Sequence, residues 1–277
     1  MPAVPSNLAV RLATAFVGVP VILSLLYLAP PWAFYLLVLA VSLVGVHELF
    51  ALTHQRDILA QSVGVLVSAA GSLAVYLRSD DASAVLGVAV GVPLTALLFT
   101  LVRPGAVETA ATRAFALGTG PLLIVVPLTL LAVMRRGQAQ TGANAVLLAL
   151  GLAWLGDTVA YFVGRFFGRR KLYEAISPKK TVEGAIAGLV ASVAWAVLGS
   201  RVYLRGVLPL SHALGLGILA GALGQAGDLG ESLLKRSIGV KDSGSIVPGH
   251  GGILDRVDAL LMTSVAVFFY ARWADWR

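Results

Sequence analysis

The sequence contains no cysteine and few charged residues. The absence of cysteine among 277 residues excludes a disulfide framework, a thiolate zinc site and a cysteine nucleophile. Charged residues make up only 13% of the chain, whereas a soluble domain carries about 25%. Apolar residues make up 58%, and the mean hydropathy is +0.86. This composition excludes the soluble enzyme folds and indicates an integral membrane protein that is surrounded by a lipid bilayer.

The apolar residues gather in runs long enough to cross a membrane. A helix of about 20 apolar residues spans the hydrocarbon core, and long runs without alternation favour helices over a β-barrel. We therefore predict an all-α, polytopic fold with about nine transmembrane helices. The predicted spans are 9–29, 32–52, 59–77, 83–102, 114–134, 143–165, 182–204, 209–229 and 257–275.

The positive charges predict the orientation. If the N-terminus is cytoplasmic, 14 of the 21 Lys and Arg residues fall on the cytoplasmic side and seven on the other. We expect a protein of the cell (inner) membrane with its N-terminus and both large polar loops, 166–180 and 230–256, in the cytoplasm. The gathering of Lys and Arg in cytoplasmic loops then accounts for the net charge of +7, and no nucleic-acid partner is expected.

The chain divides by polarity into two parts. Residues 1–142 are predicted to form a scaffold of transmembrane helices with short loops, and residues 143–277 a catalytic transmembrane region with the two polar loops. Small residues spaced four apart, at Gly184 and Gly188 and at Gly217 and Gly221, permit close helix contacts. These contacts are expected within one chain, and a homodimer stays open.

The densest polar stretch carries two acidic pairs. Asp228 and Glu231 are three residues apart at the end of one predicted span, and Asp255 and Asp258 repeat this spacing at the start of the next. Each pair shares a helix face. Facing carboxylates suit Mg²⁺, which completes its coordination with water and substrate phosphates. The alternative, a solvated loop, is disfavoured because acids are costly at membrane depth.

Cations and glycines lie between the two acidic pairs. Lys235, Arg236 and Lys241 can neutralise the phosphates of a polyphosphate, and the glycines let backbone N–H groups approach an anion. His250 is a candidate phosphate ligand or acid–base group, although a turn histidine bonded to backbone is the alternative.

A second constellation lies upstream. Asp157 falls deep in a predicted span and is expected to line a polar cavity. Ser177-Pro178 has the pattern of a helix start, which predicts that Lys179, Lys180 and Thr181 lie at a helix N-terminus where a phosphate can dock. An ordinary helix start with interfacial lysines is the alternative. For Glu48, in the second span, structural and functional roles both stay open.

Together these motifs resemble the phosphatidate cytidylyltransferases, or CDP-diacylglycerol synthases. The downstream signature is Ser232, Lys235-Arg236, Lys241-Asp242, Pro248, His250-Gly251-Gly252 and Asp255-Arg256-Val257-Asp258. The upstream motifs are Asp157-x-x-Ala160-Tyr161-x-x-Gly164 and Ser177-Pro178-Lys179-Lys180-Thr181-x-Glu183-Gly184. One position departs from the pattern, because Val247 stands where the family usually has Leu, Ile or Phe, and we expect this to affect packing only.

The resemblance implies a reaction of CTP with phosphatidic acid that gives CDP-diacylglycerol and pyrophosphate. It also implies a requirement for Mg²⁺, with two metal ions expected at the site. The candidate catalytic residues are Asp228, Lys235, Arg236, Lys241, Asp242, His250, Asp255, Arg256 and Asp258. The candidate substrate-binding residues are Asp157, Ser177, Lys179, Lys180, Thr181, Glu183, Ser232, Gly251 and Gly252. The candidate metal ligands are Asp228, Glu231, Asp255 and Asp258.

Two other functions fit parts of the sequence. CTP-dependent polyprenol or phytol kinases are similar in the lysine, Pro-Gly-His-Gly-Gly and acidic segment, but the Ser-Pro-Lys-Lys-Thr stretch favours the cytidylyltransferase. A transporter would explain nine spans with an aspartate at depth. Transporters usually show paired repeats, however, and this sequence shows none.

Overall fold

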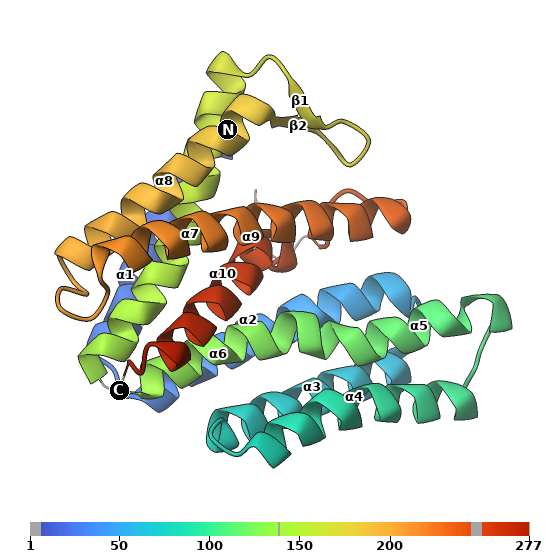
Figure 1. Cartoon of the computed structure of the whole chain (residues 1–277). Coiled ribbons are helices and arrows are strands. Elements are labelled where there is room, and N and C mark those ends of the chain that lie inside the picture. Colours follow the sequence, from blue (N-terminus) through green and yellow to red (C-terminus); the bar gives the residue numbers. More distant parts are fainter. Residues whose placement is uncertain (1–6, 138, 245–250, 277) are drawn as a thin grey trace, which may run out of the picture.

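The computed structural model describes residues 7–137, 139–244 and 251–276, apart from the side chains of residues 7–15 and 139. Helices make up most of this part of the chain (Figure 1). They are α1 Asn7–Tyr27, α2 Pro31–Thr53, α3 Ile58–Arg78, α4 Ala82–Val102, α5 Val107–Gly120, the π-helical segment η1 Pro121–Val125, α6 Val126–Arg136, α7 Ala139–Phe167, α8 Val182–Arg201, α9 Leu210–Ser237 and α10 Leu254–Trp273.

The helices confirm the all-α, polytopic prediction. Each predicted span overlaps one continuous helical segment of the described residues, with α5, η1 and α6 forming a single rod. Six of these segments are long and apolar enough to cross a membrane, namely α2, α3, α4, the α5–η1–α6 rod, α7 and α8. That α1, α9 and α10 also cross stays a prediction.

Local sequence explains where several helices begin. The Asp57 carboxylate accepts a hydrogen bond from the Ala60 N–H (3.1 Å), and Asp81 accepts one from the Ser83 N–H (3.0 Å). These side chains satisfy N–H groups that have no partner inside the first helical turn. The two aspartates therefore cap α3 and α4, each of which follows a short connection.

The α5–η1–α6 rod is largely enclosed by other helices. In the apolar stretch of the rod 72% of the residues are buried, whereas in that of α4 only 17% are. The rod packs against α2 and α3, and its α6 part also contacts α7 and α10. Pro121 and Pro127 have no N–H to donate, so each removes one α-helical hydrogen bond. The π-helical segment begins at Pro121 and ends two residues before Pro127.

The second half of the chain forms a compact group in which α7 packs on α8, α8 on α9, and α9 on α10 (Figure 1). Glycine permits this close approach. A Cβ at Gly188 would lie 2.8 Å from the Gly156 carbonyl oxygen of α7, and one at Gly221 would lie 2.8 Å from the Ser192 Cβ of α8. The predicted contacts of small residues within one chain are confirmed.

A β-hairpin connects α7 to α8. Strand β1, Lys171–Tyr173, pairs antiparallel with β2, Ser177–Thr181, so that Lys171 faces Thr181. The prediction that Ser177-Pro178 starts a helix is therefore wrong. The helix begins at Val182, and Thr181 caps it by accepting a hydrogen bond from the Gly184 N–H (3.2 Å). Lys179 and Lys180 lie on a strand that leads to the helix.

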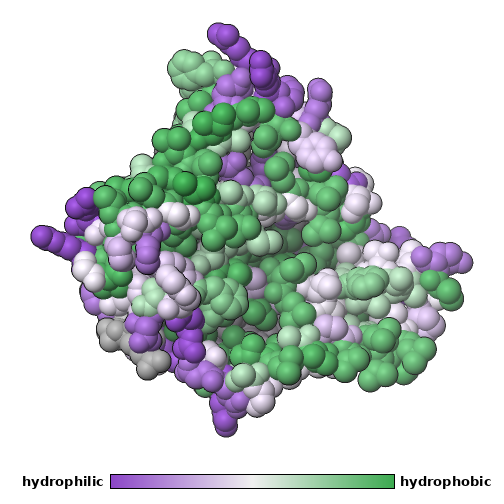
Figure 2. All heavy atoms as spheres, in the orientation of Figure 1, coloured by the Kyte–Doolittle hydropathy of each residue, from purple (hydrophilic) through white to green (hydrophobic). Residues whose placement is uncertain are grey.

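The downstream polar segment also differs from the expected loop. Helix α9 continues to Ser237, eight residues beyond the predicted end of its span, so Glu231, Ser232, Lys235 and Arg236 are helical. Figure 2 shows hydrophobic side chains over much of the visible face, with hydrophilic residues gathered at its extremities. Such a surface suits contact with lipid.

Candidate active site

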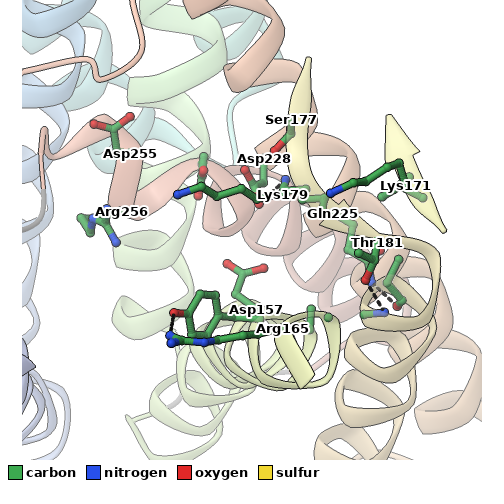
Figure 3. Close-up of a pocket in the computed structure, with 18 residues that line it drawn as sticks. Asp157, Arg165, Lys171, Ser177, Lys179, Thr181, Gln225, Asp228, Asp255 and Arg256 are labelled. Atoms are coloured by element: carbon green, nitrogen blue, oxygen red, sulfur yellow. Dashed lines mark hydrogen bonds and ion pairs between the residues drawn. The ribbon is translucent and has the colours of Figure 1, made fainter. Parts of the chain in front are cut away.

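A cavity of about 680 Å³ lies among α7, the hairpin, α8, α9 and α10 (Figure 3). Charged and polar side chains of α7, the hairpin, α9 and α10 contribute to its walls, and α8 contributes Gly184 and Ala185. The lining residues are Asp157, Ala160, Tyr161, Gly164, Arg165, Lys171, Leu172, Ser177, Lys179, Lys180, Thr181, Gly184, Ala185, Gln225, Asp228, Asp255, Arg256 and Asp258. The two constellations found in the sequence therefore meet at one site.

Three helices each contribute a carboxylate to this cavity, and α10 also contributes Asp255. Asp157 comes from α7, Asp228 from α9 and Asp258 from α10, and Asp157 points toward Asp228 in Figure 3. Asp258 is buried, with 8% of its surface exposed, and lies close enough to Asp228 and Asp157 for their charges to repel. Such a concentration of buried negative charge needs cations nearby.

The hairpin supplies cations to the same cavity. Lys180 forms an ion pair with Asp228, in which both side chains are about one quarter exposed. Lys179 and Lys171 also line the cavity, and Lys171 donates a hydrogen bond to the Pro178 carbonyl oxygen (2.6 Å) across the hairpin. The β-hairpin therefore brings lysines to the carboxylates without a helix N-terminus.

Helix α7 contributes two lining residues with polar side chains that were not among the candidates. Tyr161 and Arg165 follow Asp157 at intervals of four residues, so all three share one helix face. Arg165 donates a hydrogen bond to the Tyr161 hydroxyl (2.9 Å). This spacing is visible in the sequence and could have identified both residues.

A buried lysine links the two acidic pairs. Lys235, whose side chain is 13% exposed, pairs with Glu231 at 2.5 Å and also with Asp255. Asp255 further accepts hydrogen bonds from the Gly252 N–H (2.8 Å) and the Ser243 N–H (3.0 Å). Glu231 and Asp255 therefore share a cation, and Glu231 does not line the cavity.

Other candidates lie beside the cavity rather than in its walls. Arg236 connects the end of α9 to the hairpin, because it donates hydrogen bonds to the carbonyl oxygens of Ile176 (3.3 Å) and Val240 (3.1 Å). Glu183 accepts hydrogen bonds from the N–H groups of Arg169 (3.0 Å) and Arg170 (3.2 Å), at the start of the hairpin. Both hold the cavity wall in place.

Five further candidates lie within the part of the chain that the structure describes but not at the cavity. Lys241 and Asp242 are exposed, Ser232 is half-buried, and Gly251 and Gly252 precede α10. None of these five lines the cavity.

His250, together with Pro248 of the same motif, lies outside the described residues.

Two of the cavity carboxylates fit Mg²⁺. Within residues 7–137, 139–244 and 251–276, no three acidic or histidine side chains are grouped to hold an ion by themselves. Mg²⁺ is usually bound by one or two carboxylates, with water and substrate phosphates completing its shell. Asp228 and Asp258 face one cavity and interact electrostatically, so their donor chemistry suits such an ion.

Comparison with known proteins identifies relatives of this chain. A phosphatidate cytidylyltransferase of Synechocystis sp. is 44% identical over 130 residues, 47% of this chain and 44% of that protein. One of Bacillus subtilis is 42% identical over 134 residues, 48% of this chain and 49% of that protein. An uncharacterized protein of Escherichia coli is 38% identical over 162 residues, 57% of this chain and 50% of that protein.

The alignments with these relatives cover about half of their length. The match to the sequence profile of the family is longer and extends over residues 9–274. It includes the scaffold helices, the hairpin and every wall of the cavity. The chain therefore belongs to the Cytidylyltransferase family.

Proposed function

We propose that this protein transfers a cytidylyl group from CTP to phosphatidic acid, giving CDP-diacylglycerol and pyrophosphate in phospholipid biosynthesis. The observation that carries the proposal is one cavity in which carboxylates of α7, α9 and α10 meet lysines of the hairpin. The names of the Synechocystis and Bacillus subtilis relatives support phosphatidate as the acceptor.

The reaction needs no protein nucleophile. A phosphate oxygen of phosphatidic acid attacks the α-phosphorus of CTP, and the bond from that phosphorus to the oxygen bridging the β-phosphorus breaks. Pyrophosphate leaves with that oxygen. Because a lipid phosphate and a triphosphate repel each other, cations must bring them together. Lys179, Lys180 and Arg165 line the cavity and can neutralise these phosphates.

The proposed cofactor is Mg²⁺, bound by Asp228 and Asp258 together with substrate phosphates. Bound Mg²⁺ supplies stabilisation of the negative charge that develops on the transferring phosphate. In this assignment Lys180, which pairs with Asp228, connects the metal ligands to the phosphate-binding hairpin. Asp157 keeps the cavity polar at depth in α7. A second ion at the same site is part of this proposal.

We further propose that the cavity opens to the cytoplasm at the cell membrane. The two-to-one excess of Lys and Arg on that side supports this orientation. It also suits the substrates, because CTP is cytoplasmic whereas phosphatidic acid is held in the bilayer.

Labelled CTP tests the proposed reaction. The purified protein in detergent receives phosphatidic acid, Mg²⁺ and CTP labelled at either the α- or the γ-phosphorus. Label from the α-position is expected in the lipid, with release of pyrophosphate. Transfer of γ-label with formation of CDP would instead show a lipid kinase, and CTP binding without any transfer would contradict both reactions.

A further inference from the structure

Helix α10 begins without a cap from its own sequence. Its N-cap residue is Ile253, and no side chain at that position accepts a hydrogen bond. The first N–H groups of a helix have no partner within the helix, so a buried start needs acceptors from elsewhere. The residues that follow, Asp255, Arg256 and Asp258, line the cavity. What holds this first turn therefore also sets the position of three cavity residues.

Glu48 of α2 supplies the missing acceptors. Its carboxylate accepts hydrogen bonds from the N–H groups of Ile253 (3.0 Å) and Leu254 (2.9 Å). The Glu48 side chain comes from the scaffold, about 200 residues earlier in the chain, and only 3% of its surface is exposed. A carboxylate at this point also interacts favourably with the positive end of the helix dipole.

Two neighbouring glycines leave space for this carboxylate. A Cβ at Gly244 would lie 2.6 Å from Glu48 Oε1, and one at Gly252 would lie 2.5 Å from Oε2. Real Cβ atoms do not approach so closely, so only glycine leaves room for Glu48 at both positions. Gly252 of the signature therefore packs against the scaffold, whereas the sequence suggested contact with substrate.

Ser243 joins Glu48 to Asp255. Its hydroxyl oxygen lies 2.9 Å from Glu48 Oε2 and 3.1 Å from Asp255 Oδ2, and its single proton can bond to either carboxylate. Asp255 in turn pairs with Lys235 on α9. A continuous polar network thus runs from α2 to the start of α10 and on to α9.

We propose that Glu48 is a positioning residue, which fixes the first turn of α10 and so places Asp255 and Asp258 for the reaction. It does not line the cavity itself. Its kinetic consequence rests on the proposed cytidylyl transfer. A displacement of about 1 Å at a catalytic group can cost about 10²-fold in rate, so the loss of this support is expected in turnover more than in substrate affinity.

The test compares Glu48→Gln with His47→Gln, since His47 is the exposed neighbour on the same helix. Hydrogen–deuterium exchange of the Ile253 and Leu254 amides needs no substrate. We expect Glu48→Gln to speed this exchange about tenfold, in line with the loss of charge-assisted hydrogen bonds, and His47→Gln to leave it unchanged. Equal exchange in both variants would contradict the contact.

Kinetics then separate positioning from simple support of the fold. Glu48→Gln should lower kcat for cytidylyl transfer about 10²-fold, while KM for CTP and the melting temperature stay near those of the wild type. Ser243→Ala, which leaves Glu48 in place, should lower kcat in the same direction by a smaller factor. An unchanged kcat, or a loss of kcat that only follows a loss of folded protein, would overturn the proposal. A wild-type protein without transfer activity would instead contradict the proposed function, and the exchange result would still report on Glu48.

Discussion

Single residues set the electrostatics of the cavity. Asp157, Asp228 and Asp258 bring three carboxylates together, and Lys180 is paired directly with one of them. Asp258 is buried beside like charges, so its charge costs stability in the absence of a bound cation. The proposed catalytic role of Asp258 and the stability of the fold therefore make opposite demands on this residue.

Replacement of Asp258 by Asn should separate these two demands. Asp258→Asn is expected to lower cytidylyl transfer by about 10²-fold or more, the range for loss of one group that stabilises transition-state charge. The melting temperature should stay the same or rise, because the substitution removes a buried like charge. Activity assays and thermal unfolding in detergent measure the two effects.

Asp80→Asn provides a matched control. Asp80 pairs with Arg272, and both side chains are more than half exposed, so this ion pair should contribute little. Near-normal activity of Asp258→Asn at ordinary Mg²⁺ would remove Asp258 from the proposed metal site.

Replacement of Lys235 should instead destabilise the fold. Lys235→Met would leave Glu231 and Asp255 buried without their shared cation, and a broken buried ion pair costs about 3–5 kcal/mol. The melting temperature should fall clearly, and the double variant Lys235→Met/Glu231→Gln should recover part of the loss. Lys241→Met, at an exposed position, serves as the control. An equal shift for both single variants would show that the Lys235 pairs do not stabilise the fold.

The sequence predicted the cavity acids because their spacing is local. Asp255 and Asp258 are three residues apart, and Asp228 stands out as an acid at the end of an apolar run. The role of Glu48 could not be read in this way, because its partners are about 200 residues away. Only the packing of α2 against the start of α10 shows what a lone acid in an apolar helix does.

Among the secondary-structure elements, the hairpin has the clearest role in the proposed site. It carries Lys179 and Lys180 into the cavity wall, and Arg236 connects it to the end of α9. Because the two lysines belong to one short element, they can be tested together without disturbing the transmembrane helices.

Replacement of Lys179 or Lys180 by Ala should weaken use of phosphatidic acid more than binding of CTP. We expect KM for phosphatidic acid to rise at least about tenfold, since a charge-assisted contact to phosphate contributes about 1.5–3 kcal/mol. Steady-state kinetics and CTP binding measure the two quantities separately. Glu174→Gln, in the exposed turn of the same hairpin, is the control. An equal loss of affinity for both substrates would contradict this division of roles.

Helices and hairpin differed in how well the sequence predicted them. Long apolar runs determine helices in a bilayer because every backbone group must be satisfied within the segment, and the nine runs were recognised for this reason. Ser177-Pro178 has a pattern common at helix starts, but the pairing of Lys171 with Thr181 favours a strand there. Pro178 fits a two-stranded sheet because a strand at an edge tolerates a missing N–H.

The charge distribution predicts one orientation of the whole molecule in the membrane. The orientation is simple to test because the sequence has no cysteine, so a single introduced cysteine is the only thiol that can be labelled. Glu174→Cys in the hairpin should react with a membrane-impermeant reagent from the cytoplasmic side. Arg205→Cys, in the exposed loop after α8, should react from the opposite side. Labelling of both from one side would contradict the predicted orientation.

The enclosed α5–η1–α6 rod has a consequence for biogenesis. Two of its neighbours, α7 and α10, are synthesised after it, so the rod must enter the bilayer before they can cover it. Its apolar composition suits this early, lipid-exposed stage. Its close packing suits the later one. The buried Thr129 hydroxyl meets that of Ser72 at 2.8 Å, and a Cβ at Gly120 would lie 2.9 Å from a Leu49 methyl group. One stretch of sequence thus serves two successive environments, first lipid and then protein.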